Sequence, residues 1–179
     1  MLTAATAIEE IRKILEQEKT FSEWPAWVAD SNPREGRLSF VTGIATGGVS
    51  FPGFRIRGSA PQGVVGRDVV LQVEALLGSR RWLHISRIEY KPLGGHLNPF
   101  SRRDVPRQIP PGVSHVHGFE DNAVLGLDAF SPTSNLPIAR ILDPSPTSLR
   151  GFLRSAGTML AIPDFEHIDS PPWQGRLPV

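Results

Sequence analysis

The 179-residue chain contains no cysteine, so a disulfide framework, a thiolate nucleophile and a cysteine-type zinc site are all excluded. It also lacks any apolar run long enough to cross a bilayer. The first twenty residues carry acidic side chains where a signal peptide would have its apolar core. We therefore expect a cytoplasmic protein that makes no use of a membrane. No phosphate-binding glycine loop of the Walker or dinucleotide type is present either.

An excess of charge of one sign is missing as well, because 19 Lys and Arg balance 18 Asp and Glu, for a net charge of +1. Apolar residues make up 40% of the chain, which is ordinary for a globular protein. The length predicts a single domain over residues 1–179. Within it we expect a helical N-terminal segment (1–35), an α+β body (36–165) and an irregular tail (166–179).

Apolar residues at helical spacing mark both ends of the chain. Ile8, Ile11 and Ile14 predict an amphipathic helix that ends near Lys19. A second helix is predicted from about 149 to 160, with Thr147 or Ser148 as its N-cap.

The middle of the chain has the composition of β-strands, rich in Val, Ile and Phe and interrupted by turn residues. Gly47-Gly48 predicts a hairpin turn, and the lack of helical segments between strands favours antiparallel pairing. The expected fold class is therefore α+β: a curved antiparallel meander of about five to seven strands, flanked by the N-terminal and C-terminal helices. The strands are expected at 37–46, 49–58, 68–77, 81–90, 113–119 and 123–130.

Three histidines are the candidate chemical groups. His115 and His117 are two residues apart, so on a strand both imidazoles lie on the same side. His96 follows two glycines in a turn that is able to bring it beside that pair. We expect the three to converge in one concavity, either as ligands of a divalent metal such as zinc or as proton donors and acceptors.

Positive charge is concentrated in the middle of the chain, and nearly all of it is arginine, which suits bidentate contacts to phosphate. On the strand at 81–90, alternation predicts that Arg87 and Glu89 share the face opposite His84. We expect Arg87, Arg102 and Arg103 to bind an anionic substrate. RNA or another anionic ligand is accordingly an expected partner.

Four segments occur in a recognisable order: ISRIEY (85–90), GGHLNPF (94–100), SHVHGF (114–119) and a helix near the C-terminus. Together they resemble an uncharacterised family of small prokaryotic proteins that is distantly similar to proteins encoded in toxin–antitoxin pairs. In the resemblance, Asn98 and Pro99 belong to the same signature as His96 and the histidine pair. We take Asn98 as a further candidate for substrate binding.

Two classes of function follow. One is a small toxin-like ribonuclease or phosphodiesterase, a hydrolase of anionic substrates that uses the histidine cluster. The other is a non-catalytic interaction protein, such as an antitoxin, that binds a cognate protein partner. A metal-binding module similar to cupins is a further alternative, because cupins also carry a His-x-His pair on a strand.

Overall fold

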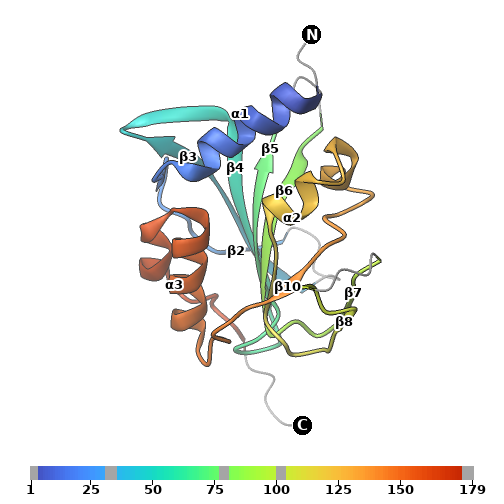
Figure 1. Ribbon diagram of the computed structural model, residues 1–179. Helices are drawn as coiled ribbons and strands as arrows, with labels where there is room; N and C mark the ends of the chain where they lie inside the picture. Colours follow the sequence, from blue (N-terminus) through green and yellow to red (C-terminus); the bar gives the residue numbers. More distant parts are fainter. Residues whose placement is uncertain (1–3, 31–35, 77–80, 100–103, 175–179) are drawn as a thin grey trace.

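A computed structural model describes residues 4–30, 36–76, 81–99 and 104–174 of the chain (Figure 1). The N-terminal helix α1 (Ala4–Glu16) buries Ala7 and Ile11 and exposes its charged face. It ends three residues before Lys19, whose buried ammonium donates hydrogen bonds to the carbonyls of Ile14 and Leu15. A positive charge on these last carbonyls is the favourable arrangement at a helix C-terminus.

Four long antiparallel strands form the centre of the fold, pairing in the order in which they occur in the chain. The predicted α+β class, with an antiparallel sheet and helices near both ends, is confirmed, although the sheet has eight strands where about five to seven were expected. Strand β9 continues the sheet beyond β6, β10 follows β9, and two short strands pair with β3 at the opposite edge. The eight strands of the sheet are β1 (Thr20–Phe21), β2 (Val28–Ala29), β3 (Arg37–Thr46), β4 (Val49–Pro61), β5 (Val69–Ala75), β6 (Leu83–Tyr90), β9 (His115–His117) and β10 (Arg140–Ile141).

A separate two-stranded hairpin, β7 (His96–Leu97) with β8 (Gln108–Ile109), interrupts the path from β6 to β9. The hairpin turn between β3 and β4 is the predicted one. Gly47 and Gly48 have φ angles of 55° and 79°, as a two-residue turn with both central residues left-handed requires.

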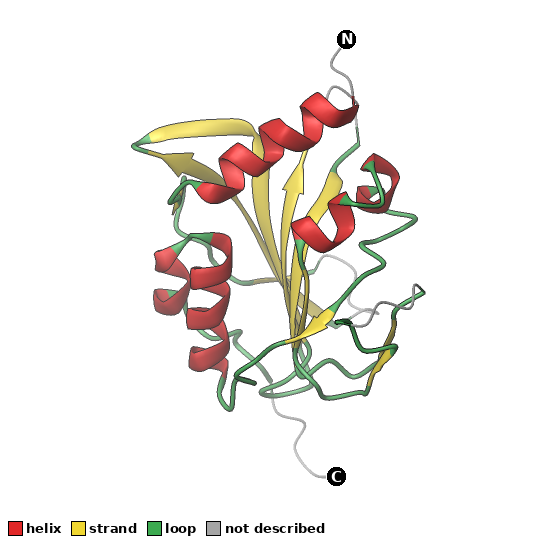
Figure 2. Ribbon diagram, in the orientation of Figure 1, coloured by secondary structure: helices red, strands yellow, loops and turns green. Residues whose placement is uncertain are grey.

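The helices cover one face of the sheet and leave the other face open (Figure 2). Helix α3 (Leu149–Leu160) begins at Ser148, whose hydroxyl accepts a hydrogen bond from the backbone of Gly151. Its Phe152 packs on Tyr90 of β6, with ring centroids 5.1 Å apart. Ile11 of α1 joins the same core, which is closed by Phe165 of the short helix η2 (Pro163–His167).

The predicted strand at 123–130 is wrong. The chain there forms helix α2 (Phe119–Ala123) and the 3₁₀-helix η1 (Leu127–Phe130). Phe119 and Asn122 are buried three residues apart, which is the spacing of a helix face and not of a strand. Glu120 and Asp121 lie in the first turn, where they favour a helix start.

The segment expected to be an irregular tail is tied to the core, since Ile168 is buried and the carbonyl of Asp169 accepts a hydrogen bond from the Trp27 indole. None of the helices within the described ranges has the length and apolar character needed to span a bilayer.

Candidate functional site

The candidate site lies on the open face of the sheet, where β6 and β9 pair. Arg87 is in register with His117, and Glu89 is in register with His115. Between them, Ile88 and Val116 pair and point toward the helix-covered face, where both join the apolar core. Strand alternation therefore places the arginine, the glutamate and both histidines on the same side.

The three predicted histidines come together. The ring of His96, carried by the hairpin strand β7, lies 4.6 Å from that of His117 and 5.8 Å from that of His115. The rings of His115 and His117 are 5.2 Å apart. Their surroundings differ from the expectation of an open concavity, because His115 is 1% and His117 0% exposed. The cluster is thus a buried group at the edge of the open face.

Glu89 is a member of the cluster. Its carboxylate oxygens lie 3.7 Å from His115 Nε2 and 3.5 Å from His117 Nε2. Among the described residues, Glu89, His115 and His117 form a trio whose potential ligand atoms all lie within 4.8 Å of one another. The expected metal set contained His96 in place of Glu89. His96 instead directs its Nε2 to the carbonyl of Pro137, 3.0 Å away.

Backbone carbonyls fix the tautomers of the two buried histidines. His115 Nδ1 lies 2.9 Å from the carbonyl oxygen of Val113, and His117 Nδ1 lies 2.6 Å from that of Leu136. A carbonyl oxygen only accepts, so both Nδ1 atoms carry the proton. The Nε2 lone pairs are left facing Glu89. This is the arrangement in which protein histidines bind metals, with one nitrogen held by a neighbouring acceptor and the other free to coordinate.

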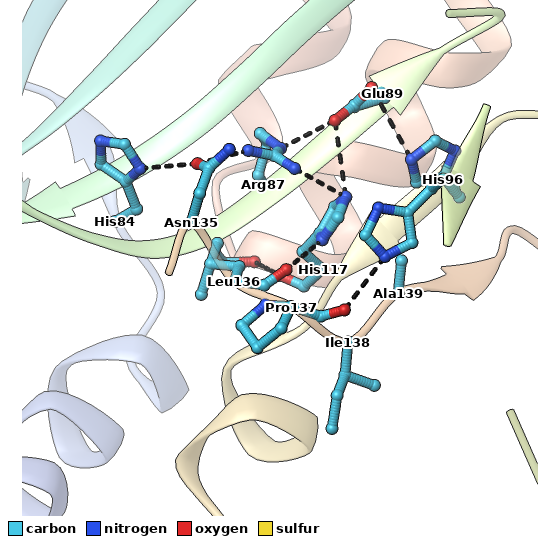
Figure 3. Close-up of polar contacts among 12 residues, drawn as sticks. His84, Arg87, Glu89, His96, His117, Asn135, Leu136, Pro137, Ile138 and Ala139 are labelled. Atoms are coloured by element: carbon cyan, nitrogen blue, oxygen red, sulfur yellow. Dashed lines mark hydrogen bonds and ion pairs between the residues drawn. The ribbon is translucent and has the colours of Figure 1, made fainter. Parts of the chain in front are cut away.

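Arg87 links the members of the cluster (Figure 3). Its Nε lies 2.7 Å from a carboxylate oxygen of Glu89, and its Nη2 donates to His117 Nε2 at 2.9 Å. Its Nη1 donates to the side-chain oxygen of Asn135 at 2.6 Å, and the same oxygen accepts from His84. The guanidinium expected to bind substrate is therefore in contact with three side chains of the site itself.

The environment sets the charges of the cluster. Burial, together with the charge of Arg87, outweighs the opposing effect of Glu89 and lowers the pKa of His117 to about 4. Burial would raise the pKa of Glu89, but the positive charge of Arg87, whose Nε lies 2.7 Å from the carboxylate, opposes burial and keeps that pKa below its usual value. Burial also lowers the pKa of His96. At neutral pH the site therefore presents neutral His117 and His96 beside ionised Glu89 and Arg87.

Two buried asparagines hold the segment 136–139 that supplies carbonyls to the histidines. The amide of Asn98 bonds to both the N–H and the C=O of Ala139, and Asn122 does the same for Ile138. Asn98 also donates to the carbonyl of Pro106 and is only 3% exposed. Its polar atoms are thus occupied by the backbone. Its position fits a supporting role in the site, where the sequence suggested contact with substrate.

His84 lies on a different face from the one that alternation along the strand predicts. A bulge at Ile85 shifts the register between β5 and β6, so that His84 pairs with Glu74 while Ser86 pairs with Val73. This extra residue brings His84 onto the same face as Arg87, contrary to the simple alternation expected from sequence. Arg102 and Arg103 lie outside the described residues.

This geometry is suited to holding a divalent cation on Glu89, His115 and His117, or to moving protons between imidazoles next to a fixed positive charge. Searches against protein-family models, curated proteins and solved structures found no match for this chain.

Proposed function

We propose that the protein is a hydrolase of phosphodiester bonds, with RNA as its substrate class, and that Glu89, His115 and His117 hold a divalent cation such as zinc. The observation that carries the proposal is the trio itself: two Nε2 lone pairs and a carboxylate within 4.8 Å of one another. Two nitrogens and one carboxylate are a ligand set of known catalytic zinc sites, which keep a further position open.

The residues fit such a cation in charge as well as in type. The lowered pKa of His117 keeps its imidazole neutral at pH 7, and the lowered pKa of Glu89 keeps its carboxylate ionised. Metal ligands must be deprotonated, so no proton has to be expelled from these two residues before binding. When bound, the cation would supply a water of lowered pKa as nucleophile and a positive charge beside the phosphate.

Arg87 has a role in this proposal that its contacts suggest. Its guanidinium already touches Glu89 and His117, and His117 Nε2 would have to give up its hydrogen bond from Arg87 in order to hold a cation. The contact with Asn135 retains the side chain at the site. The Nη2 donor of Arg87 would then be available to stabilise charge that develops on phosphate oxygens.

The same contact favours a second candidate, hydrolysis without a metal. With Arg87 on His117 and the carboxylate of Glu89 beside His115, the imidazoles serve as proton acceptors and Arg87 as the charged group that stabilises the transition state. The two candidates differ in one measurable property, the metal content of the active protein.

The first experiment therefore measures metal in the purified full-length protein by mass spectrometry, after exposure to zinc or manganese and removal of free ions. We expect stoichiometric metal in the wild type and its loss in His115→Ala and Glu89→Gln. His167→Ala is the matched control, because His167 is exposed and contacts only Glu166 within the described residues. Circular dichroism establishes that each variant is folded.

The second experiment measures cleavage of single-stranded RNA by the same proteins. If the variants that lose bound metal also lose cleavage, the result supports the metal-dependent hydrolase. Cleavage by metal-free protein supports the acid–base candidate. Failure of the folded wild type to cleave RNA and a simple phosphodiester, with and without metal, would overturn the proposed function. Growth inhibition on expression, relieved by His115→Ala, would be the cellular counterpart of RNA cleavage by a toxin.

A further inference from the structure

A polar cavity of about 430 Å³ opens on the sheet face beside the cluster. Its walls come from four neighbouring strands, β3 to β6, together with Asn135. Only Arg87 and Glu89 belong both to this cavity and to the cluster. The lining residues are Arg37, Arg57, Ser59, Val70, Gln72, His84, Arg87, Glu89 and Asn135. We call it the arginine cavity.

The arginine cavity has an excess of positive charge. Three arginines face a single carboxylate among the residues that line it, and that carboxylate, Glu89, is already in contact with Arg87. Arg57 is exposed, and no hydrogen bond or ion pair engages its guanidinium in the part of the chain that the structure describes. Arg37 donates to Ser59 Oγ at 3.1 Å, and its ion pair with Asp68 is long, with 3.9 Å between Nη1 and Oδ2. The guanidinium groups of Arg37 and Arg57 are thus able to bind an anion through their N–H donors.

Other arginines of the open face do not contribute in this way. Arg55, two residues before Arg57 on the same strand, is paired at 2.5 Å with the buried carboxylate of Glu74 and lies over the ring of Trp82. Lys91, which follows β6, does not contribute to the cavity either, since its ammonium lies over the ring of Tyr90, a core residue of the helix-covered face. Among the described residues, the arginines of the cavity come from three different strands: Arg37 from β3, Arg57 from β4 and Arg87 from β6.

The register aligns this charge with the cluster. Arg57 on β4 pairs with Gln72 on β5, Gln72 pairs with Arg87 on β6, and Arg87 pairs with His117 on β9. Neighbouring strands are about 4.8 Å apart, so Arg57 stands about 10 Å from Arg87 along a row perpendicular to the strands. A ligand that bridges this row needs anionic groups at both ends, as the successive phosphates of a nucleic-acid strand provide.

We infer that the arginine cavity is a phosphate subsite, in which Arg37 and Arg57 bind a backbone phosphate of single-stranded RNA while a neighbouring part of the strand reaches the cluster. The placement of the scissile bond rests on the proposed function, whereas the binding of phosphate rests on the cavity alone. Guanidinium groups match phosphate oxygens in pairs of parallel hydrogen bonds, and Ser59 is able to add a hydroxyl donor. The bound RNA strand runs across β4, β5 and β6 toward His117.

The test uses Arg37→Gln and Arg57→Gln, singly and together, in the full-length protein. Binding of a fluorescent single-stranded RNA hexanucleotide is measured by anisotropy at a series of salt concentrations. We expect the double variant to bind about tenfold or more weakly. We also expect the magnitude of the slope of log K against log salt to fall by about 0.7, because the double variant loses one phosphate contact and each such contact contributes about 0.7 for a single strand.

Arg154→Gln is the matched control, since it removes the same charge from the exposed face of α3. It should leave affinity and slope unchanged. A mononucleotide and inorganic phosphate, added as competitors, separate the possible sources of the phosphate. If the mononucleotide or inorganic phosphate displaces the RNA when added at micromolar concentration, the subsite serves a small phosphorylated molecule and the nucleic-acid assignment is overturned.

Kinetics separate this inference from the proposed function. The double variant should raise KM for the hexanucleotide and leave kcat and metal content as in the wild type, whereas His115→Ala should abolish turnover and leave RNA affinity intact. If RNA affinity and the salt slope are unchanged in the double variant, the subsite is overturned, even if the wild type cleaves RNA. Intact binding without turnover in the wild type overturns the hydrolase and leaves the subsite standing.

Discussion

The two faces of the sheet are built by the same strands, and they differ in almost every physical property. Ile56, Leu71 and Ile88 are 0% exposed beneath the helices. Each has a polar neighbour in the chain that lies on the open face: Arg57 next to Ile56, Gln72 next to Leu71, and Arg87 next to Ile88. One face is apolar and covered, and the other carries charge and the arginine cavity. A single step along a strand thus separates a residue that stabilises the fold from one that is available for binding, so substitutions at adjacent positions should have unrelated consequences.

The largest expected effect comes from the covered face. Phe152→Ala removes a fully buried ring that packs on Tyr90, and we expect a loss of about 3–5 kcal/mol in the free energy of unfolding. Arg57→Ala on the open face should change it by less than about 0.5 kcal/mol. Urea denaturation of both variants measures the contrast. Equal losses would show that the two faces are not energetically distinct.

The next effect concerns the buried edge of the open face. Because the pKa of His117 is lowered to about 4, the unfolded chain binds its proton more readily than the folded chain between about pH 6.5 and 4. Stability that is fully present above pH 6.5 is therefore lost as the pH falls through 4, by up to about 3 kcal/mol. The measurement is urea denaturation of metal-free protein from pH 7.5 to 4.

Substitution of the histidine sharpens this pH test. His117→Gln should flatten the pH dependence between 6.5 and 4, and the exposed His167 serves as control through His167→Gln, which should leave it unchanged. An unchanged profile in His117→Gln would show that His117 does not titrate abnormally in the folded protein.

A smaller effect is expected at a close contact between two neighbouring strands on the covered face. A Cβ atom on Gly58 would lie 2.1 Å from the Phe40 ring of the neighbouring strand, and Trp27 packs edge-on against that ring at 4.8 Å. Gly58→Ala should therefore destabilise the protein by about 1–3 kcal/mol through overpacking. Gly53→Ala is the control on the same strand, because its Cβ would meet only an ordinary contact at 3.5 Å. Thermal unfolding distinguishes them.

The smallest effect has the opposite sign. Ala161 ends α3 in the left-handed conformation, with φ of 51°, which costs a non-glycine residue about 1 kcal/mol. Ala161→Gly should relieve this strain and raise the midpoint of thermal unfolding by a few degrees. Ala156→Gly, in the buried interior of the same helix, should lower it. A decrease in both variants would contradict the assignment of strain at Ala161.

Local patterns were sufficient to predict most of the scaffold. The strand at 37–46 has the predicted bounds, the other three long strands differ by a few residues at their ends, and the helix capped by Ser148 was predicted at 149–160. Each of these depends on alternation, helical spacing or turn residues within one short segment. The error at 123–130 arose because apolar residues were interpreted as a strand, although Gly118 followed by Glu120 and Asp121 is the pattern of a helix start.

The site was harder to predict because it depends on pairing between distant segments. The proximity of three histidines followed from their types and spacing, but the place of Glu89 depends on the register of β6 with β9, more than twenty residues away. The face of His84 depends on a bulge that no local pattern marks. The carbonyls of Leu136 and Pro137 carry no side-chain signal, so their bonds to His117 and His96 were beyond inference from sequence.

The segment 136–139 has a consequence for how the site meets a ligand. The side chains of Asn98 and Asn122 hydrogen-bond the backbone of this segment. The segment's own carbonyls in turn bond to ring nitrogens of His117 and His96. These imidazoles have lost their rotational freedom during folding, before any ligand arrives. Side chains ordered only on binding lose about 0.5–1.5 kcal/mol each in entropy, so a site ordered in advance retains more of its interaction energy as affinity.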